Sequence, residues 1–592
     1  MLPDESIKSW TKGEFVPFKN LREMVLAGFL CLFSLLFIIS LFKNISYPLF
    51  WADESMTVMH GARVLEYGYP KVHDGKNVLY DLRHSNPTLG TDEKTDAYIG
   101  GANWGMYYFA TIGIKLAETS DDIFTKTAII RTTFALAGLV GLALTAFLAT
   151  HFFSGALAKM TFLVIFAFFE LLSVPLVLHL REARYYSLNL LLTALFIFVY
   201  TYYRILNRTG HMTYTLFSTL LLWLVFVTFS PAYFILVVSV LVFESLLFAQ
   251  YFFQRYLVRL EWRDLPAPRL KMPFFACLKG LLPLLLSLAG VAPLLSFFRI
   301  FSIAEEMAKF NATSIYSLYL DNSLAMWRYC ASFEYIYLAM FLKICLILLA
   351  VLPGKELFPS DKRRGTFSNF LTVIFIVYFL AVAKIPNFPF TRYFIPLQPI
   401  LAVIIILDLA TVYYRISLRQ TPGVIYRKVI LFGVAACLFF YTLANNGEFI
   451  EGHVYELSHR YQGPLDQIIP FIKQKYANTD NLIIATNYEE TSFMYYLGSR
   501  VIVGFVGNNL EQDAQAVPDI IIYRKGWGNF GDVFNGFLQR QRYERISFPV
   551  FDRQVNNIPE LNPLFIFPHQ FKTLESGHES AKTDIYLKAQ KG

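Results

Sequence analysis

Eleven long apolar runs divide this chain, and each is long enough to cross a lipid bilayer as a helix. Apolar residues make up 55 % of the chain and charged residues only 16 %, a balance typical of membrane proteins. The sequence therefore predicts a polytopic α-helical membrane protein with about eleven transmembrane helices. The runs occupy residues 24–43, 127–150, 158–179, 185–206, 212–230, 231–252, 275–298, 335–353, 367–384, 393–414 and 428–445.

Aromatic content, charge and cysteine spacing narrow the class further. The 58 phenylalanines and 36 tyrosines fit a chain with many helix ends at membrane interfaces. The net charge of +8 has no basic stripe or motif behind it, so no nucleic-acid partner is expected. The five cysteines show no metal-ligand or disulfide spacing, so neither a disulfide framework nor a structural zinc site is indicated.

Basic clusters set the predicted orientation. Residues 104–116 form a shorter apolar run of about 13 residues that contains Lys115. If this run lies in the interface, five basic clusters share one face, which the positive-inside rule makes cytoplasmic. We therefore expect an interfacial helix there, a cytoplasmic N-terminus and an extracytoplasmic C-terminus. The clusters are the N-terminal tail, residues 204–208, 255–271, 355–364 and 415–428.

This topology predicts three domains. Residues 1–23 form a cytoplasmic tail, residues 24–445 the membrane domain with a long first outer loop at 44–126, and residues 446–592 an extracytoplasmic domain. In the last of these, residues 482–485, 501–503 and 519–523 predict buried strands, and residues 464–476 and 530–541 predict helices. The domain is thus α/β, and it has no glycine-rich or Walker signature for a nucleotide.

Two adjacent carboxylates, Asp53 and Glu54, follow the first span and precede a short amphipathic helix. An acidic residue at this place is commonly a solvated helix cap. The alternative is a general base on the outer face, because a carboxylate can accept the proton of an attacking hydroxyl. The residues leave both interpretations open.

A polar segment with two arginines separates the third span from the fourth. It contains His179, Arg181, Glu182 and Arg184, followed by Tyr185. Charged groups so close to the hydrocarbon are costly and usually pair or serve a function. Arginines that snorkel to the interface are the simpler explanation, but the combination also fits an anion site with its own counter-charges.

Three further cations lie on the predicted outer face, where the positive-inside rule disfavours them. Arg131 stands at the outer end of the second span, and Lys384 and Arg392, with Tyr393, lie outside the ninth and tenth. Each alone fits an interfacial anchor. Together they fit recognition of a phosphate group.

The loop at residues 299–334 contributes Arg299, Glu305 and Glu306, which could cover a site on the outer face as a lid or acceptor contact. Most charges in such a loop are simply solvated. In the first loop, His73, Asp74 and His84 have a spacing that matches no known metal site, so no metal site is predicted.

Three motifs make the chain resemble a known group. They are Trp-Ala-Asp-Glu at residues 51–54, Arg-Glu-Ala-Arg-Tyr-Tyr at 181–186 and Arg-Tyr-Phe-Ile-Pro-Leu at 392–397. Their order resembles that of the GT-C membrane glycosyltransferases, in particular the protein O-mannosyltransferase and lipid A aminoarabinose transferase group, glycosyltransferase family 39. The resemblance covers residues 20 to about 415. One departure is Ala-Asn-Trp-Gly at residues 102–105, where family members often have His-Pro-Pro or Lys-Pro, so contacts of that motif are not carried over.

The resemblance implies a reaction and roles for the candidate residues. The donor would be a sugar on a polyprenyl monophosphate, and the acceptor a hydroxyl of lipid A, an envelope glycan or a protein, at the outer face of a bacterial plasma (inner) membrane. Asp53 would be the base and Glu54 would orient it or the acceptor. The leaving phosphate would be bound by Arg131, Arg181, Arg184, Tyr185, Arg392 and Tyr393.

Direct displacement inverts the anomeric carbon and needs one base. No cofactor is implied beyond the donor. A divalent metal is compatible with the site, but nothing in the sequence indicates one. Two other classes remain open: a lipid or glycan transporter or flippase, and a non-catalytic membrane scaffold that presents the α/β domain.

Overall fold

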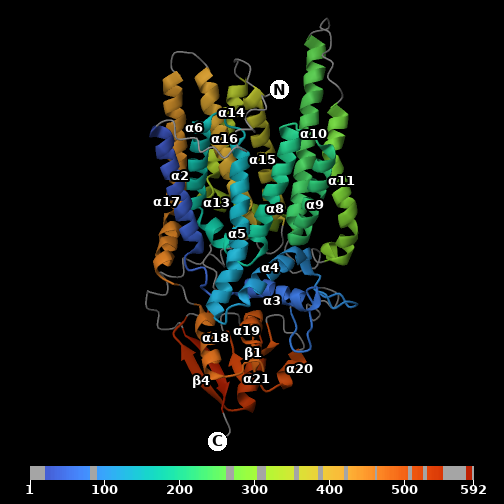
Figure 1. The fold of residues 1–592 in the computed structure, drawn as a ribbon, viewed down its shortest axis with the longest axis vertical. Coiled ribbons are helices and arrows are strands. Elements are labelled where there is room, and N and C mark those ends of the chain that lie inside the picture. Colours follow the sequence, from blue (N-terminus) through green and yellow to red (C-terminus); the bar gives the residue numbers. More distant parts are fainter. Residues whose placement is uncertain are drawn as a thin grey trace.

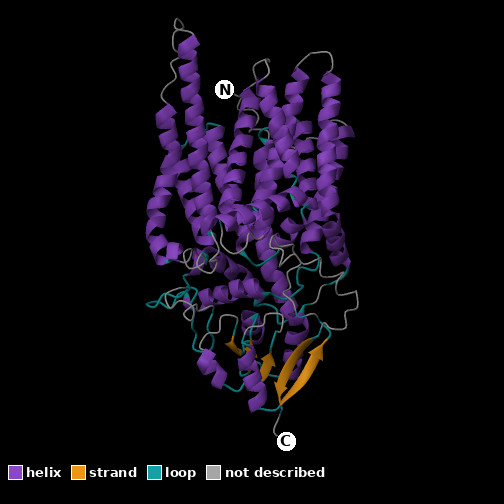
Figure 2. Cartoon of the chain, turned by 180° about the vertical axis from the view of Figure 1, so that it is seen from behind, coloured by secondary structure: helices purple, strands orange, loops and turns teal. Residues whose placement is uncertain are grey.

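The computed structural model of the 592-residue chain has a helical bundle at one end and an α/β domain at the other (Figure 1). It describes residues 21–79, 90–261, 273–302, 315–351, 359–384, 391–418, 424–460, 463–504, 510–524, 530–550, 552 and 582–589. Two helices, α3 and α4, lie across the end of the bundle between these two parts (Figures 1 and 2).

The described residues include nine helices long and apolar enough to span a membrane, or eleven if two bent helix pairs each count as one span. Every one of the eleven predicted runs falls on one of these helices, so the predicted fold class is confirmed. The bundle consists of α2 (Leu21–Phe42), α5 (Ile123–Thr150), α6 (Ala156–Leu172), α7 (Val174–Leu180), α8 (Tyr185–Tyr200), α9 (His211–Thr228), α10 (Ser230–Glu261), α11 (Pro273–Phe297), α13 (Ile315–Phe333), α14 (Ile336–Val351), α15 (Pro359–Ala383), α16 (Leu397–Leu418) and α17 (Val424–Ser458).

The two bent pairs have local causes. The axis turns by 79° between α6 and α7, where Pro175 lies in the first turn of α7 and cannot donate a helical hydrogen bond. It turns by 89° between α13 and α14, where Tyr335 has a left-handed φ of 54°. The sequence predicted an outer loop at residues 299–334. The structure instead has the helix α13 at Ile315–Phe333. Its polar residues Asp321, Asn322 and Arg328 interrupt the apolar run by which a span is recognised.

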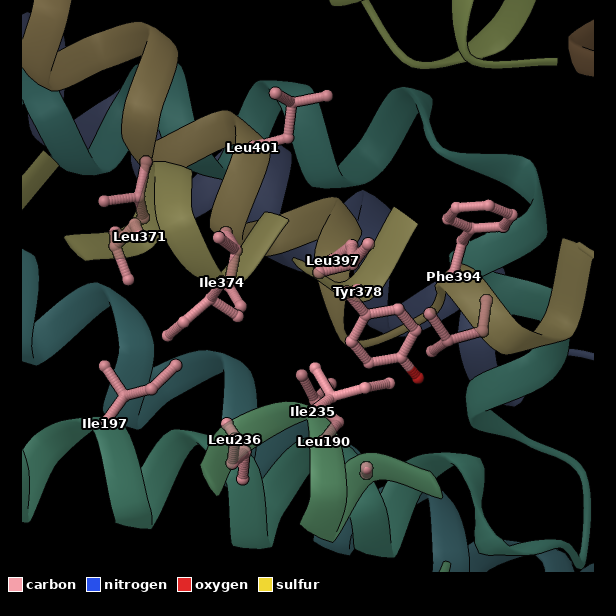
Figure 3. Packing of buried hydrophobic residues seen from close by; sticks show 14 of the residues in the cluster. Leu190, Ile197, Ile235, Leu236, Leu371, Ile374, Tyr378, Phe394, Leu397 and Leu401 are labelled. Carbon is pink, nitrogen blue, oxygen red and sulfur yellow. The ribbon is translucent and has the colours of Figure 1, made fainter. Parts of the chain in front are cut away.

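Close packing in the bundle interior involves aliphatic and aromatic side chains from α8, α10, α15 and α16 (Figure 3). Small residues allow the backbones to approach where helices cross. At Gly141 of α5, an added Cβ would lie 3.0 Å from the backbone N and Cα of Leu191 in α8. Many large apolar side chains on α2, α9 and α17 are exposed instead, as expected of surfaces that face lipid.

Helices α3 (Ala52–Tyr67) and α4 (Trp104–Ala117) pack against each other. The 14 residues of α4 are about 21 Å long, too short to cross a hydrocarbon core of about 30 Å. Its position across the end of the bundle agrees with the interfacial helix predicted for residues 104–116 (Figure 1). Gly61 allows this contact, because a Cβ there would lie 2.7 Å from Ile114 and 3.2 Å from the carbonyl oxygen of Tyr107.

The C-terminal α/β domain has one five-stranded sheet in the order β2-β1-β3-β5-β4. Strands β1 (Ile483–Thr486), β2 (Arg500–Val503) and β3 (Ile520–Ile522) are parallel, with Ile484 paired to both Val501 and Ile520. They confirm the three predicted strands, and α18 (Pro464–Lys475) and α21 (Gly531–Arg540) confirm the two predicted helices. The sequence did not predict β4 (Tyr543–Phe548), β5 (Thr583–Lys588), α19 (Glu490–Leu497) or α20 (Leu510–Gln515).

The α/β domain is docked on the segment that leads into α3. The backbone N–H of Phe50 donates to the Tyr496 hydroxyl at 3.1 Å, and Ser492 donates to the Phe50 carbonyl oxygen at 2.8 Å. Leu49 donates its N–H to Asp466 of α18 at 2.7 Å. Leu49 and Phe50 also belong to the same buried apolar cluster as residues of α18 and α19. The two domains therefore share a core at α3.

Replacing Gly141 with leucine should destabilise the protein by about 1–3 kcal/mol, because the new side chain would force α5 away from α8. Thermal unfolding of the detergent-solubilised protein measures this. The matched control is Gly28→Leu in α2, where no side chain of the described residues lies within 4 Å of an added Cβ. Equal melting temperatures for the two variants would contradict the packing described for α5 and α8.

Candidate active site

Asp53 lies in the first turn of α3, and the structure does not make it a cap. The N-cap residue of α3 is Trp51, with no side-chain cap hydrogen bond. Within the described residues, no backbone N–H of α3 donates to the Asp53 carboxylate. The Asp53 side chain is 30 % exposed, so it can be reached from outside while protein surrounds most of it. The position favours the general-base interpretation over the helix cap.

Two arginines from distant parts of the chain face the Asp53 carboxylate. Arg184 Nη2 and Arg392 Nη1 lie 3.4 Å and 3.7 Å from Asp53 Oδ2. Arg184 also donates to the backbone oxygen of Asp53 at 3.0 Å and to Thr57 Oγ1 at 3.2 Å. Burial disfavours the Arg184 charge, but Asp53 and neighbouring tyrosines outweigh it, so the pKa of Arg184 is raised. Arg184 therefore remains a cation beside the candidate base.

Aromatic rings form one side of this group. Tyr185 stacks on Phe229 with ring centroids 4.3 Å apart, and Phe229 stacks on Tyr393 at 6.1 Å. The guanidinium carbon of Arg184 lies 5.6 Å from the Tyr185 ring centroid, and that of Arg392 lies 5.6 Å from the Trp51 ring centroid. Cation–π contacts of this kind hold guanidinium groups in place without using all their N–H donors. The predicted residues Arg184, Tyr185, Arg392 and Tyr393 thus meet around Asp53 in what we call the Asp53 cluster.

Glu54, next to Asp53, points into the protein and is fully buried. Arg131 Nε donates to Glu54 Oε1 at 2.8 Å, and Arg131 Nη2 donates to Glu54 Oε2. Arg131 Nη1 donates to the carbonyl oxygens of Ile45 and Pro48. The sequence grouped Arg131 with the phosphate-binding arginines. In the structure the Arg131 guanidinium forms its hydrogen bonds with Glu54 and with the chain before α3. Arg131 therefore has a structural role.

Glu54 also fixes the turn that carries Arg184. Its Oε1 accepts the backbone N–H of Ala183 at 2.8 Å. One carboxylate therefore ties α3, α5 and the turn between α7 and α8 together. The sequence predicted that Glu54 orients Asp53 or the acceptor. Its contacts in the structure go to Arg131 and to the backbone of Ala183, so any effect on Asp53 would be indirect.

Other predicted residues lie elsewhere or outside the described residues. Arg181 Nη1 is 3.5 Å from the carbonyl oxygen of Lys43, and no contact with Asp53 is recorded for it among the described residues. Arg299 lies close enough to Asp92 of the first loop to lower the pKa of that carboxyl, after the larger effect of the Thr95 hydroxyl. Glu305 and Glu306 lie outside the described residues.

His73 and Asp74 of the first loop each contact a charged side chain within the same part of the chain. His73 Nδ1 is 2.6 Å from Asp96 Oδ1, and Asp74 Oδ2 is 2.5 Å from Arg63 Nη2. His84 lies outside the described residues. Within the part of the chain that the structure describes, no three His, Cys, Asp or Glu residues are grouped as metal ligands, and metal dependence stays untested.

Residues of the α/β domain reach the Asp53 cluster, and no sequence signal indicated them. Ser55 Oγ is 2.6 Å from Thr491 Oγ1, and Ser492 donates to Ser55 Oγ at 2.9 Å. Burial first, and then the charges of Glu489 and Asp53, raise the pKa of Tyr488 well above its usual value. About 430 residues separate these positions from Asp53, so only the tertiary structure reveals their proximity.

A polar cleft of about 230 Å³ opens between the first outer loop and the α/β domain. His73, Lys76 and Asn77 line one side, and Glu490 and Arg500 line the other. Asn77 holds the two sides together, because its amide contacts the Ser499 carbonyl oxygen at 3.0 Å and the Val501 N–H at 2.8 Å. The cleft reaches the N-terminal end of α19, which also contacts α3.

His60 lies further along α3, completely buried between the rings of Tyr98 and Tyr107, with both centroids 4.6 Å away. Neither of its ring nitrogens has a hydrogen-bond partner in the described structure. Burial, followed by the charges of Arg63 and Arg184, lowers the pKa of His60 to about 3. His60 is therefore neutral in the folded protein.

Among solved structures similar to this chain is ArnT from Cupriavidus metallidurans, crystallised in the apo state. The match has a TM-score of 0.49 and 11 % sequence identity, and it covers 95 % of this chain and 98 % of that chain. No protein-family model and no curated protein matches the sequence.

Replacing Arg131 with methionine should cost about 3–5 kcal/mol of stability, because Glu54 would stay buried without a counter-charge. The double variant Glu54→Gln/Arg131→Met should recover part of this loss. The control is Lys115→Met, because Lys115 and its partner Glu118 are both exposed and their loss should leave the stability nearly unchanged. Thermal unfolding compares these variants, and equal shifts for Arg131→Met and Lys115→Met would refute the buried pair.

The stability of the protein should fall as the pH drops below about 6.5, because the unfolded state protonates His60 there and the folded state does so only near pH 3. Protonation of His60 in the unfolded state should account for at most roughly 1.4 kcal/mol of lost stability per pH unit. His60→Phe should flatten this part of the profile, measured as melting temperature from pH 7.5 to pH 5. The control His151→Phe, at an exposed position, should leave the slope unchanged. An unaltered slope in His60→Phe would count against a buried neutral imidazole.

Proposed function

We propose that this chain is an inverting glycosyltransferase of the membrane interface. It moves a sugar from a polyprenyl phosphate to an acceptor hydroxyl. The observation that carries the proposal is the pairing of the partly exposed Asp53 carboxylate with Arg184 and Arg392, both within 4 Å, at the end of the bundle. A base and two phosphate-binding cations in one place are the groups that this reaction needs.

The reaction is a single displacement. The acceptor hydroxyl attacks the anomeric carbon, and Asp53 takes the hydroxyl proton as the new C–O bond forms. The bond from the anomeric carbon to the phosphate oxygen breaks, and its electron pair leaves with the lipid phosphate. Arg184 and Arg392 stabilise the charge on that phosphate. Direct displacement inverts the anomeric carbon, and one carboxylate suffices.

The two arginines are suited to exchange partners when the donor binds. Their N–O distances to Asp53 of 3.4 and 3.7 Å are longer than those of charge-assisted hydrogen bonds. The donor phosphate would draw both guanidinium groups toward itself and release Asp53 for the acceptor. Trp51 and Tyr185, which lie against the guanidinium groups, would keep the arginines at the site during this exchange.

Donor and acceptor would reach Asp53 from different sides. The lipid-linked donor lies in the bilayer, and the stacked rings of Tyr185, Phe229 and Tyr393 lie on the bundle side of Asp53. The acceptor would come from the polar cleft between the first loop and the α/β domain. We place this side outside the membrane and the N-terminus in the cytoplasm, following the basic clusters.

The substrates are proposed as classes. The donor is a pentose, hexose or amino sugar on a polyprenyl phosphate, and the acceptor is lipid A, an envelope glycan or a protein hydroxyl. Asp53, Arg184 and Arg392 act on the anomeric carbon and the phosphate, which all these donors share. Nothing in their arrangement requires a cofactor, and divalent-metal dependence can be tested by adding EDTA.

Asp53→Asn should lower the rate of sugar transfer about 10²–10⁴-fold, the usual contribution of a general base, with little change in stability. Arg184→Lys and Arg392→Lys should also lower transfer, because lysine cannot form the same two-pronged contact with phosphate. The assay uses radiolabelled polyprenyl-phosphate sugars and an extract of envelope acceptors, and NMR of the product reports the anomeric configuration.

Asp121→Asn, an exposed carboxylate between α4 and α5, is the control and should keep full activity. Undiminished transfer by Asp53→Asn would exclude Asp53 as the base. A wild-type protein inactive with every donor tried would favour a transporter or a scaffold instead, and a product that retains its configuration would exclude single displacement.

A further inference from the structure

Two helix breaks meet inside the bundle, away from the Asp53 cluster. One is Ser173 between α6 and α7, and the other is the Glu334–Tyr335 step between α13 and α14. Gln398, in the first turn of α16, lies against both. Broken helices in a membrane bundle expose polar backbone and side-chain groups, and they commonly mark binding sites for ions or substrates.

The breaks enclose a small cavity with polar walls. Its volume of about 20 Å³ is enough for about one water molecule or one ion. Five polar residues line it together with apolar residues of α6, α13 and α16: Glu170, Ser173, Glu334, Tyr335 and Gln398. Glu170 and Gln398 are each only 5 % exposed.

The polar atoms left without partners around this cavity are all oxygens. Tyr329 and Gln398 donate to Glu334 Oε1, at 2.8 and 2.5 Å, so the Gln398 amide nitrogen is used and its oxygen is left over. No hydrogen-bond partner is present in the described structure for Glu170 Oε1, Ser173 Oγ, Tyr335 Oη or Gln398 Oε1. Buried polar groups are rarely left unpaired, so a cavity with four such oxygens needs an occupant.

The charge balance indicates what kind of occupant fits. Other buried carboxylates of the bundle have a basic partner: Glu244 lies 2.7 Å from Arg204 and Asp408 lies 3.0 Å from Lys343. Among the described residues, neither Glu170 nor Glu334 forms an ion pair with a basic side chain. Two uncompensated carboxylates in a low-dielectric interior are very unfavourable.

We propose that Glu170, Glu334, Gln398 and Ser173 bind one calcium ion in this cavity. A divalent cation neutralises both carboxylates, and an all-oxygen set with carboxylate and amide ligands is typical of calcium. Zinc prefers nitrogen and sulfur ligands, which are lacking among the residues that line the cavity. Magnesium demands near-ideal octahedral geometry and gives up its waters reluctantly, whereas calcium accepts an irregular set of oxygen ligands.

The location gives the ion a positioning role. Helix α7 connects Ser173 to the turn that carries Arg184, a distance of about 10 Å along its seven residues. Gln398 follows Arg392 by six residues in the sequence, and α7 packs against the short 3₁₀ helix at Thr391–Phe394. A calcium ion that joins both helix breaks to α16 would therefore fix the spacing of the two arginines, a consequence that rests on the proposed function.

The binding test does not depend on sugar transfer. Full-length protein is purified in detergent, stripped with EDTA and dialysed against radioactive calcium chloride. The wild type should bind about one calcium ion per chain, and calcium should raise its melting temperature. Glu170→Gln and Glu334→Gln should each weaken calcium binding roughly tenfold or more, because one charged ligand is lost.

Glu244→Gln is the matched control, since this buried carboxylate already has Arg204 as partner, and it should bind calcium like the wild type. The double variant Glu170→Gln/Glu334→Gln should melt at the same temperature with and without calcium. In EDTA it should be more stable than the wild type, because two facing charges have been removed.

Three results would overturn the calcium site. They are a wild type that binds no calcium, calcium binding that survives in Glu170→Gln, and tighter binding of zinc or magnesium than of calcium in parallel dialyses. The transfer assay separates this proposal from the preceding one. Loss of transfer in Asp53→Asn with intact calcium binding would show that the two sites are distinct.

Discussion

The buried ion pair between Glu54 and Arg131 is the interaction on which the rest of the site depends. Two desolvated charges persist only when their hydrogen-bonding capacity is nearly satisfied, and here Ala183, Ile45 and Pro48 complete it. The pair thereby joins α5, the start of α3 and the turn after α7. Arg184 follows Ala183 directly, so the same contacts that stabilise Glu54 hold a cation beside Asp53.

The α/β domain is part of this construction. Its helix α19 packs on the first turn of α3, and Ser492 and Tyr496 bind the backbone at Phe50. In the proposed reaction Asp53 would gain from such support, because misplacement of a catalytic group by about 1 Å can cost about 10² in rate. The domain also forms one wall of the polar cleft, which is the route proposed above for the acceptor.

Charges in the bundle fall into two groups with different physical roles. Glu244 with Arg204, and Asp408 with Lys343, neutralise each other inside the protein and join neighbouring helices. Asp53, Arg184 and Arg392 lie at the end of the bundle and keep partial access to solvent, as a reacting site requires. Glu170 and Glu334 belong to neither group, because they are buried without a basic partner among the described residues. The cation proposed for the helix breaks would neutralise them.

The sequence alone determined the fold class, the three buried strands of the α/β domain, the short helix at residues 104–116 and the motifs around Asp53. These follow from local pattern and apolar run length, which a bilayer constrains strongly. Tertiary structure decided which arginines face Asp53. Arg131 and Arg184 look alike in sequence, yet one is used up by Glu54 and the other faces Asp53. Tertiary structure also decided the docking of α19, because long-range contacts leave no periodic signal. It revealed the helix α13, whose polar residues interrupt the apolar run that predicts a span.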